Sequence, residues 1–413
     1  MLDTCLSPSL MDPDALFVVR RLQQHRHIAY IVGGAIRDLL LDITPKDFDV
    51  VTSAIPAEIC KLFSYTRLIG HRFKLVHVVF RNNQKIIETS TFRRTPPIVK
   101  TPDQEASLLI RNDNVYGTPE EDAFRRDFTV NGLFYDPITN QIIDLVDGMT
   151  DIRSRTLRTI GDPDIRFQED PVRILRAIRF AAKLKFTIEP QTWHFMRIHR
   201  ERIRQSSPRR VMDETWKLLL CGAATHTVAL AHELGIWQLL APEIAPFFDD
   251  ERFHGIIMSL LRSFDAAPPQ EKHFAPILLA PILLYGVSEA FWDHLQAPWH
   301  QRVEYFKEFI QQINPLLICY GFSRKQRAIL HILLGTVLRL GHPEKPERVP
   351  PKVYSRKFFE PAFQLWQWVW KARGIPEELL SLSCEPMIQS PYKKHSRYRQ
   401  RHTPRTANQE SSL

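Results

Sequence analysis

The sequence has few of the features that reveal the class of a protein directly, and cysteine motifs are the first of these. Its five cysteines lie far apart and form no C-x-x-C motif and no Cys/His cluster with zinc spacing. That spacing indicates neither a disulfide framework nor a structural zinc site. The N-terminus also lacks the basic region and the apolar core of a signal peptide. We therefore expect the chain to work in a reducing cytoplasm.

Long apolar runs are missing as well. The most apolar stretch, from Ala275 to Val287, is short and is interrupted by Pro276 and Pro281. It fits a pair of buried helices better than a membrane span, so no membrane partner is expected. The chain has 413 residues, of which 44% are apolar and 24% charged. These values are typical of a soluble globular protein with two or three domains.

Acidic residues are too few to balance the basic ones. The chain carries 55 Lys and Arg against 46 Asp and Glu, a formal net charge of +9. This surplus favours a polyanionic partner such as nucleic acid. On charge alone, a basic protein without such a partner is the alternative.

The segment from Ile28 to Val51, IAYIVGGAIRDLLLDITPKDFDVV, is the most informative part of the chain. It predicts a strand, a Gly-Gly turn, a helix and a second strand. Gly33 and Gly34 have no Cβ, so the backbone can turn sharply there and come close to a phosphate. A helix that starts at about Ala35 would direct its free N–H groups and its positive dipole end toward that phosphate.

The second strand of this unit carries two carboxylates. Residues i and i+2 of a strand share a face, so Asp47 and Asp49 are expected side by side, with Phe48 and Val50 facing the core. Such a pair suits Mg²⁺, which keeps some water ligands and takes others from substrate phosphates. A Gly-Gly turn alone is usually a plain turn, and a D-x-D alone is usually solvated. Their combination with Arg37, one turn from the glycines, favours nucleotidyl transfer.

Two further segments supply candidate site residues. Glu88, on the predicted strand KIIETSTF, is a lower-ranked candidate for a third metal-facing acid, or alternatively it orients a basic side chain. Arg125, Arg126 and Asp127 follow an acidic loop, EED at 120–122. Two arginines can grip a triphosphate, and a carboxylate beside them can act as a third acid or accept from a ribose hydroxyl.

The segment QEDPVRILRAIRF, residues 168–180, predicts an amphipathic helix with Asp170 as its N-cap and Pro171 as its first residue. At about 100° per residue, one face is apolar and the opposite face basic. The apolar face holds Ile174, Leu175, Ile178, Ala181 and Ala182, and the basic face holds Arg173, Arg176, Arg179 and Lys183. A solvated basic face is the alternative. Because this face begins beside the candidate nucleotide site, we favour base reading by paired hydrogen bonds from Arg and Asp.

Five regions and an α+β fold class are expected. The strand patterns fall in the N-terminal part, where they predict one main sheet, and helical patterns dominate afterwards. The regions are a flexible N-terminal arm (1–13), a head (14–150), a helical neck (151–225), a helical body (226–390) and a disordered basic tail (391–413). The head strands are expected at 28–32, 47–52, 75–80, 85–92, 129–135 and 141–145, and its helices at 14–25, 35–41 and 56–63.

Three segments outside these elements carry separate expectations. The proline-containing loop from Arg93 to Arg111 is expected to be mobile without substrate. The aromatic residues between Tyr354 and Trp370 favour a helix docked on the body over a platform for stacking bases. The tail has almost no aliphatic residues and cannot form a core. Its basic side chains are expected to hold RNA, with a mere solubility tail as the alternative; they include Lys393, Lys394, Arg397, Arg399 and Arg401.

These segments, in this order, resemble the bacterial poly(A) polymerase and tRNA nucleotidyltransferase family of polymerase-β-like nucleotidyltransferases. GGAIRD with DFD is similar to the catalytic motif, and RRDFTVNGLFYD to the ribose and triphosphate motif. EDPVRILRAIRFAAKL is similar to the base-reading motif, and SPRRVMDETWKLLLCG to the neck helix that follows. The resemblance covers residues 28–240 closely and the rest loosely.

The resemblance implies a nucleotidyltransferase head with a mixed sheet, followed by an all-helical neck and body. It assigns metal binding to Asp47 and Asp49 and makes Asp127 a further essential acid. Mg²⁺, or alternatively Mn²⁺, would be the cofactor and ATP the substrate. The nucleotide contacts implied are Gly33, Gly34, Arg37, Arg126, Asp170, Arg173 and Arg176.

The two branches of the family differ in a short segment that here reads LIGHRFKLVHV, residues 68–78. It is similar to the poly(A) polymerase signature, although His71 stands where Arg or Lys is usual. The basic tail agrees with that branch. We therefore expect addition of AMP from ATP to RNA 3′ ends, with a CCA-adding tRNA nucleotidyltransferase as the alternative. A non-catalytic RNA-binding protein and a D-x-D glycosyltransferase are weaker alternatives, and contacts with RNA-decay machinery are not readable from these motifs.

Overall fold

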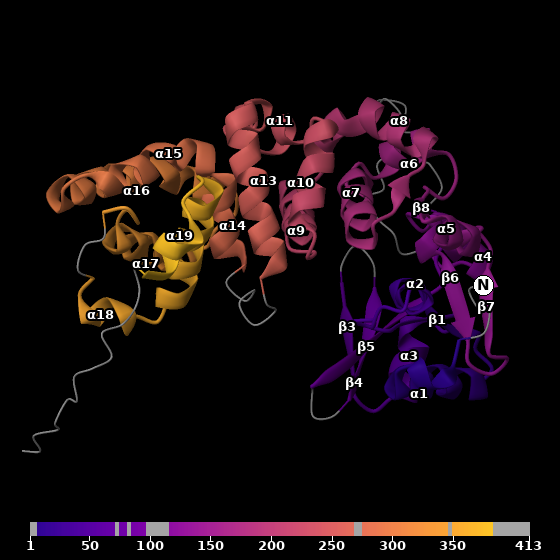
Figure 1. The fold of residues 1–413 in the computed structure, drawn as a ribbon. Helices are drawn as coiled ribbons and strands as arrows, with labels where there is room; N and C mark the ends of the chain where they lie inside the picture. Colours follow the sequence, from indigo (N-terminus) through magenta and orange to yellow (C-terminus); the bar gives the residue numbers. More distant parts are fainter. Residues whose placement is uncertain are drawn as a thin grey trace, which may run out of the picture.

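The computed structural model describes residues 6–70, 74–80, 84–95, 115–267, 275–345 and 349–382. They form an arch, with a sheet-containing head at one end and helices that continue from it to the other end (Figure 1). A mixed sheet followed by helices is the predicted α+β class.

The head is built on a seven-stranded sheet with the order β3-β4-β5-β2-β1-β6-β7. β2 and β5 are parallel, and the other neighbouring strands are antiparallel, so the sheet is mixed, as predicted. The strands are β1 Ala29–Val32, β2 Asp49–Thr52, β3 Thr66–Ile69, β4 Leu75–Phe80, β5 Lys85–Thr91, β6 Leu133–Asp136 and β7 Gln141–Asp144.

The two faces of this sheet bury separate clusters of apolar side chains. Ile31 and Val50 belong to the large core shared with the head helices, whereas Val32 and Val51 belong to a small cluster on the other face. This alternation is the period-2 pattern of a strand buried on both sides. The head helices are α1 Pro13–Gln24, α2 Gly34–Leu40, α3 Pro56–Leu62, α4 Pro119–Arg125 and α5 Gly148–Ser154.

The structure adds one strand to the predicted head and corrects two predictions. β3 was not predicted as a separate strand, because the segment around it shows no clear alternation. Residues Thr129–Asn131 form a 3-10 turn, and β6 begins only at Leu133, so the predicted strand over 129–135 is too long. β2 begins at Asp49, so Asp47 lies on the loop before the strand and not within it.

The predicted flexible N-terminal arm is also corrected in its described part, residues 6–13. Leu6 and Met11 are buried against the core. Asp12 caps α1 by accepting from the backbone N–H groups of Asp14 and Ala15 at 2.9 and 3.1 Å. Its other oxygen receives the Lys85 ammonium from β5 at 2.5 Å. These contacts dock the segment on the head.

The neck and body are mostly helical, and the prediction of an all-helical neck is corrected by two short strands within it. A two-stranded parallel pair, β8 Thr156–Leu157 and β9 Thr187–Ile188, flanks the first neck helices. The neck contains α6 Pro163–Glu169, α7 Arg173–Leu184, α8 Pro190–His199 and α9 Pro208–Leu219. The body contains α10 Ala224–Glu233, α11 Trp237–Leu240, α12 Pro246–Asp249, α13 Glu251–Ala266, α14 Ala275–Leu283, α15 Tyr285–Asp293, α16 Trp299–Cys319, α17 Arg324–Leu340, α18 Pro351–Tyr354, α19 Phe359–Ala372 and α20 Glu377–Leu382.

Two predictions about the body are confirmed. The apolar run near residue 280 forms the helix pair α14 and α15, with Leu279 and Ile282 fully buried. The aromatic segment forms α19, where Trp366 and Trp370 are buried and thus unable to stack bases. Across the described ranges, no single helix is long and apolar enough to cross a membrane. The bent pair formed by α14 and residues Tyr285–Gln296, at 82°, meets that test by length and composition only.

Candidate active site

The Gly-Gly turn lies between β1 and α2. Gly33 is the N-cap of α2 with φ 74° and ψ −125°, a conformation that residues with a Cβ rarely adopt. A Cβ on Gly33 would lie 3.3 Å from Nη1 of Arg126 and 3.6 Å from the Asn131 carbonyl oxygen. The backbone N–H of Gly33 donates to the Leu133 carbonyl on β6 at 3.0 Å. The turn is therefore fixed by the sheet, and glycine is what lets Arg126 approach it.

Arg126 follows directly after α4 and is held by a carboxylate on that helix. Its Nε and Nη2 donate to Oδ2 of Asp122 at 3.1 and 2.7 Å. Its guanidinium also lies over the Phe134 ring, 5.4 Å from the ring centre. Through these hydrogen bonds, the buried Asp122 holds the guanidinium of Arg126 beside the glycine turn.

Asp49 and Glu88 lie side by side on parallel strands. Val50 on β2 pairs with Thr89 on β5, so the residues just before them, Asp49 and Glu88, occupy the same face. Although its side chain reaches solvent, crowding by protein atoms and the charges of Glu88 and Asp47 raise the pKa of Asp49 to about 6. The positive charge of Arg126 opposes that rise. Asp49 therefore faces both the acids and the arginine.

The donor set of this face fits a divalent cation. Asp47 is largely exposed on the loop before β2, and Glu88 is more than half exposed, 3.5 Å from Nε2 of His77 across the hairpin. Carboxylate oxygens are the ligands that Mg²⁺ prefers, and a cation would relieve the repulsion that raises the pKa of Asp49. Within the described ranges, no three His, Cys, Asp or Glu side chains gather closely enough to hold a metal by themselves. Such an open site leaves coordination positions for water and substrate phosphates.

Asp127 is buried at the boundary between head and neck. One of its oxygens accepts from the Phe128 N–H at 2.9 Å and from the Asn131 amide at 3.0 Å. The other accepts from Nε of Arg176 at 2.8 Å, so the carboxylate pairs with an arginine of α7. Burial opposes ionisation, but Arg176 and the other donors hold the pKa of Asp127 well below its usual range. In this conformation Asp127 fastens the neck helix to the segment that carries Arg126.

Arg37 is also buried, and its side chain is 4% exposed. Its Nε donates to Asp38 at 2.8 Å, its Nη1 donates to the Asn131 side chain, and its guanidinium lies 5.1 Å from the centre of the Phe180 ring of α7. A Cβ on Gly34 would come within 3.5 Å of Nη2 of Arg37. The structure thus places Arg37 beneath the glycine turn, where it supports the turn and packs against the neck.

The base-reading segment differs in detail from its prediction. α7 begins at Arg173, with Val172 as its N-cap, and Asp170 ends α6 as a C-cap, so the predicted N-cap role of Asp170 is wrong. An extended backbone such as that of Asp170, with φ −150° and ψ 89°, would suit an N-cap, so the reason lies in its side chain, which pairs with another helix. Its carboxylate accepts from Nη2 of Arg210 on α9 at 2.9 Å. Arg173 is buried and donates to Glu169 at 3.1 Å.

The apolar face predicted for α7 is buried, as expected, but its basic face is not a free solvated surface. Arg176 pairs with Asp127, and Nε of Arg179 lies 2.7 Å from Glu214 of α9. Basic side chains of α7 therefore meet acids of the head and of α9.

Sequence reasoning missed three residues that organise the site. Asp122 stands four positions before Arg126, a helical spacing that could have indicated the pair. Asn131, which contacts both Arg37 and Asp127, lies inside a segment that was predicted as strand. Arg210 is 40 residues from Asp170, and no local pattern connects them.

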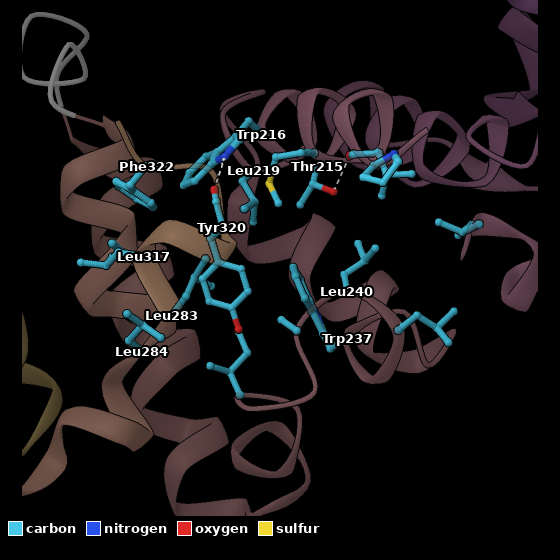
Figure 2. A pocket seen from close by; sticks show the side chains of 18 of the residues that line it. Thr215, Trp216, Leu219, Trp237, Leu240, Leu283, Leu284, Leu317, Tyr320 and Phe322 are labelled. Carbon is cyan, nitrogen blue, oxygen red and sulfur yellow. Dashed lines mark hydrogen bonds between the residues drawn. The ribbon is translucent and has the colours of Figure 1, made fainter. Parts of the chain in front are cut away.

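An apolar cavity of about 270 Å³ lies where the neck meets the body, away from these acids (Figure 2). Trp216 and Trp237 line it, and Tyr320 extends along it between α9 and α11. Nε1 of Trp216 donates to the Tyr320 carbonyl at 3.2 Å, and the Tyr320 hydroxyl donates to Glu243 at 2.9 Å. Of the described residues that line it, Arg204 alone is charged, so this cavity does not offer the chemistry of the acidic face.

Several predicted features lie outside the described residues. They are residues 96–111 of the Arg93–Arg111 loop, His71 within the 68–78 signature, and the basic tail with Lys393, Lys394, Arg397, Arg399 and Arg401. Their roles stay predictions.

Comparison with known proteins assigns the head and neck to described families. A model for the poly A polymerase head domain matches residues 29–158. A model described as the probable RNA and SrmB-binding site of polymerase A matches residues 185–248. The candidate site residues of the head, from Gly33 to Asp127, all lie within the first match.

Individual relatives come from both branches of this family. Poly(A) polymerase I of Haemophilus influenzae is 40% identical over 293 residues, covering 69% of this chain and 64% of that protein. A CCA-adding enzyme of Levilactobacillus brevis is 37% identical over 223 residues, covering 54% of this chain and 53% of that protein. The crystal structure of the Bacillus stearothermophilus CCA-adding enzyme in complex with CTP superposes with a TM-score of 0.63 at 26% identity, covering 90% of this chain and 82% of that one.

The match to curated poly(A) polymerases is partial in length. The alignments span 64% of the Haemophilus influenzae protein and 66% of the Salmonella typhi protein, just under two thirds of each. The two family models cover the head, with its acids and Arg126, and residues 185–248 of the neck and body. The chain therefore belongs to the poly(A) polymerase and tRNA nucleotidyltransferase family.

Proposed function

We propose that the chain adds AMP units from ATP to RNA 3′ ends without a template and releases pyrophosphate. The observation that carries this proposal is the placing of Asp49 and Glu88 on one face, next to Arg126 and the glycine turn. An acidic pair suits a magnesium-bound triphosphate, and an arginine beside a turn without Cβ suits its phosphates. The 40% identity to poly(A) polymerase I supports the choice of ATP.

In this proposal the residues of the head mainly position and neutralise charge. Asp47 and Asp49, with Glu88 as a further candidate, would hold two Mg²⁺ ions. When bound, one would lower the pKa of the RNA 3′-hydroxyl and the other would stabilise the leaving pyrophosphate. Arg126, held by Asp122, neutralises charge on the triphosphate. The 3′-oxygen of RNA forms a bond to the α-phosphorus while the bond from that phosphorus to the bridging oxygen of pyrophosphate breaks. Alignment of these groups and neutralisation of their charge supply much of the rate enhancement.

The neck would select the base. Asp170 and Arg173 are the proposed adenine-reading pair, since an Asp and an Arg can form complementary hydrogen bonds with a base edge. Because Asp170 is paired with Arg210 and Arg173 with Glu169, both side chains are held in defined orientations. The basic tail would hold the RNA backbone without sequence preference. We place this activity in RNA processing, including that of mRNA, in the cytoplasm.

A CCA-adding activity on tRNA is the second candidate. The observations that favour it are the CCA-adding relative at 37% identity and the superposition on a CCA-adding enzyme over 90% of this chain. The 68–78 segment and the basic tail favour the poly(A) branch instead.

Primer extension separates these two functions. The full chain is incubated with Mg²⁺, one nucleoside triphosphate at a time, and either a non-tRNA oligoribonucleotide or a tRNA lacking its CCA end. We expect a long ladder with ATP alone on both RNAs. Addition only to the tRNA, needing CTP and then ATP and stopping at CCA, would overturn the proposal.

A matched variant tests the acids in the same assay. Asp49→Asn keeps the size of the side chain and removes its charge, so extension should be lost while RNA binding measured by gel shift remains. Normal extension by Asp49→Asn would remove the metal assignment.

A further inference from the structure

A buried arginine lies between the two segments that the proposed function needs. Arg166 is on α6, and its side chain is 7% exposed. Its Nη2 donates to the carbonyl oxygens of Arg125 and Arg126, both at 2.6 Å. Its Nη1 donates to Oε2 of Glu169, also at 2.6 Å. One guanidinium thus holds the backbone that carries the triphosphate arginine.

The same guanidinium also braces the base-reading segment. Glu169, its carboxylate partner, receives Nη1 of Arg173 at 3.1 Å. Arg173 additionally donates to the backbone carbonyl of Arg166 at 2.9 Å, and the N–H of Asp170 donates to that carbonyl at 3.2 Å. Glu169 therefore links the Arg166 guanidinium to Arg173, and the Arg166 carbonyl contacts both members of the proposed adenine-reading pair.

The chemistry of this position demands a guanidinium. Burial and the nearby charge of Arg173 lower the pKa of Arg166 to about 10, so it remains a cation at neutral pH. A planar guanidinium can donate hydrogen bonds to two carbonyl oxygens and a carboxylate at the same time. A lysine ammonium is a compact point charge and lacks this planar arrangement of donors. Charge-assisted hydrogen bonds of this kind are among the strongest in proteins.

We propose that Arg166 is a positioning residue that ties the base-reading pair, Asp170 and Arg173, to the triphosphate arginine, Arg126. Base recognition by the neck and phosphate binding by the head then operate as one unit, because movement of either segment pulls on the same side chain. This inference rests on the proposed function, from which the roles of the three linked residues are taken. Arg166 itself touches backbone and Glu169, so it acts through its neighbours.

Two variants of the full chain test this role. Arg166→Lys keeps a positive charge and loses the planar arrangement of donors, and Arg166→Met removes both. Each is measured for the equilibrium affinities of ATP and CTP with Mg²⁺, for kcat and KM of AMP addition, and for RNA affinity and melting temperature. Arg200→Met is the matched control, since Arg200 of the neck also donates to a backbone carbonyl, that of Leu234 in the body at 3.1 Å, but far along the chain from the site residues.

We expect both Arg166 variants to lose about 100-fold in kcat, the size of effect that a displacement of about 1 Å produces. The ratio of ATP to CTP affinity should also fall by about tenfold, since the base-reading pair is loosened, while RNA affinity stays within twofold of the wild type. The control should change melting temperature without changing that ratio.

Two results would overturn the inference. One is an unchanged ratio of ATP to CTP affinity in Arg166→Lys with wild-type melting. The other is a loss in kcat no larger than that of the control. Should the methionine variant fail to fold, Glu169→Gln gives the same test, because it weakens the link to Arg173 and leaves the two carbonyl bonds of Arg166 in place. A wild-type chain that binds ATP selectively but transfers nothing would refute the proposed function alone, since the affinity ratio still tests Arg166.

Discussion

Asp49 is the residue at which catalysis and stability oppose each other. Its folded pKa of about 6 lies above the ordinary value of about 3.9, so the folded chain binds a proton there more tightly than the unfolded chain. By linkage, the stability of the fold decreases as pH rises through this window and the cost is complete above pH 6. The negative charge that a metal site needs therefore destabilises the metal-free protein.

We therefore expect Asp49→Asn to stabilise the metal-free chain at pH 7.5 by up to about 1 kcal/mol, since exposure to solvent screens much of the repulsion. At pH 5 the gain should be smaller, because the wild-type carboxyl is then largely protonated. Urea unfolding in EDTA at both pH values measures this difference. Asp42→Asn, an exposed carboxylate on the preceding loop, is the control, and an equal gain in both variants would contradict the explanation.

Gly33 is the second residue whose type is set by its surroundings, namely its backbone conformation and the nearby Arg126 side chain. Gly33→Ala should cost about 1–3 kcal/mol for the backbone conformation. It should also push Arg126 away, because the new Cβ would lie 3.3 Å from its Nη1. We expect weaker ATP binding, measured by equilibrium dialysis, together with a lower melting temperature. Gly255→Ala in α13, where a Cβ meets nothing within 4 Å, should instead be neutral or stabilising.

At the scale of elements, α7 joins the head to the neck through charge. The pair Arg176–Asp127 links α7 to the segment between α4 and β6, while Arg37 of α2 packs on Phe180 of the same helix. Breaking a buried pair leaves one charge without a partner, which costs more than the pair itself contributes. Replacing one member of the Arg176–Asp127 pair should therefore destabilise the contact between head and neck more than replacing both members together.

Arg176→Gln should destabilise the chain by about 2 kcal/mol, less than a fully buried pair would because Arg176 is partly exposed. The double variant Arg176→Gln with Asp127→Asn should recover part of that loss. Since the folded pKa of Asp127 is depressed, its contribution is present above about pH 4 and is lost as pH falls further. Urea unfolding at pH 7 and pH 3.5 checks both statements, and full additivity of the two changes would argue against a direct pair.

At the scale of the whole molecule, the net charge of +9 governs how the proposed RNA substrate is held. Contacts to phosphates release counterions, so RNA affinity should fall steeply as salt rises. Removing residues 391–413 should make that dependence shallower. Each phosphate contact to single-stranded RNA contributes about 0.7 to the slope of log affinity against log salt concentration, and the contacts of the tail would be lost. The KM for ATP should not change.

Fluorescence anisotropy with a labelled oligoribonucleotide at several salt concentrations measures the slope. A chain of full length whose tail lysines and arginines are replaced by glutamine is the matched control, and it should behave like the truncated chain. An unchanged slope in both variants would show that the tail serves solubility and that the folded regions hold the RNA.

Local patterns predicted those parts of the fold that depend on local chemistry. The Gly-Gly turn, the burial of Val50 in the core and the apolar face of α7 all follow from residue spacing. The same spacing misplaced the strand over 129–135 and the N-cap at Asp170. At these two places Asn131 and Asp170 make long-range contacts, with Arg37 and Arg210, that no spacing rule contains.

The sequence by itself determined the class of the protein, because a glycine turn, paired acids and a basic helix are local patterns with defined chemistry. Only the tertiary structure decided what these groups do to one another. It brought Glu88 beside Asp49, raised the pKa of that acid, and buried Arg37, Asp127 and Arg173 in ion pairs and hydrogen bonds between segments. The physical reason is that electrostatic effects depend on distance and burial in space, and residues far apart in the chain set both.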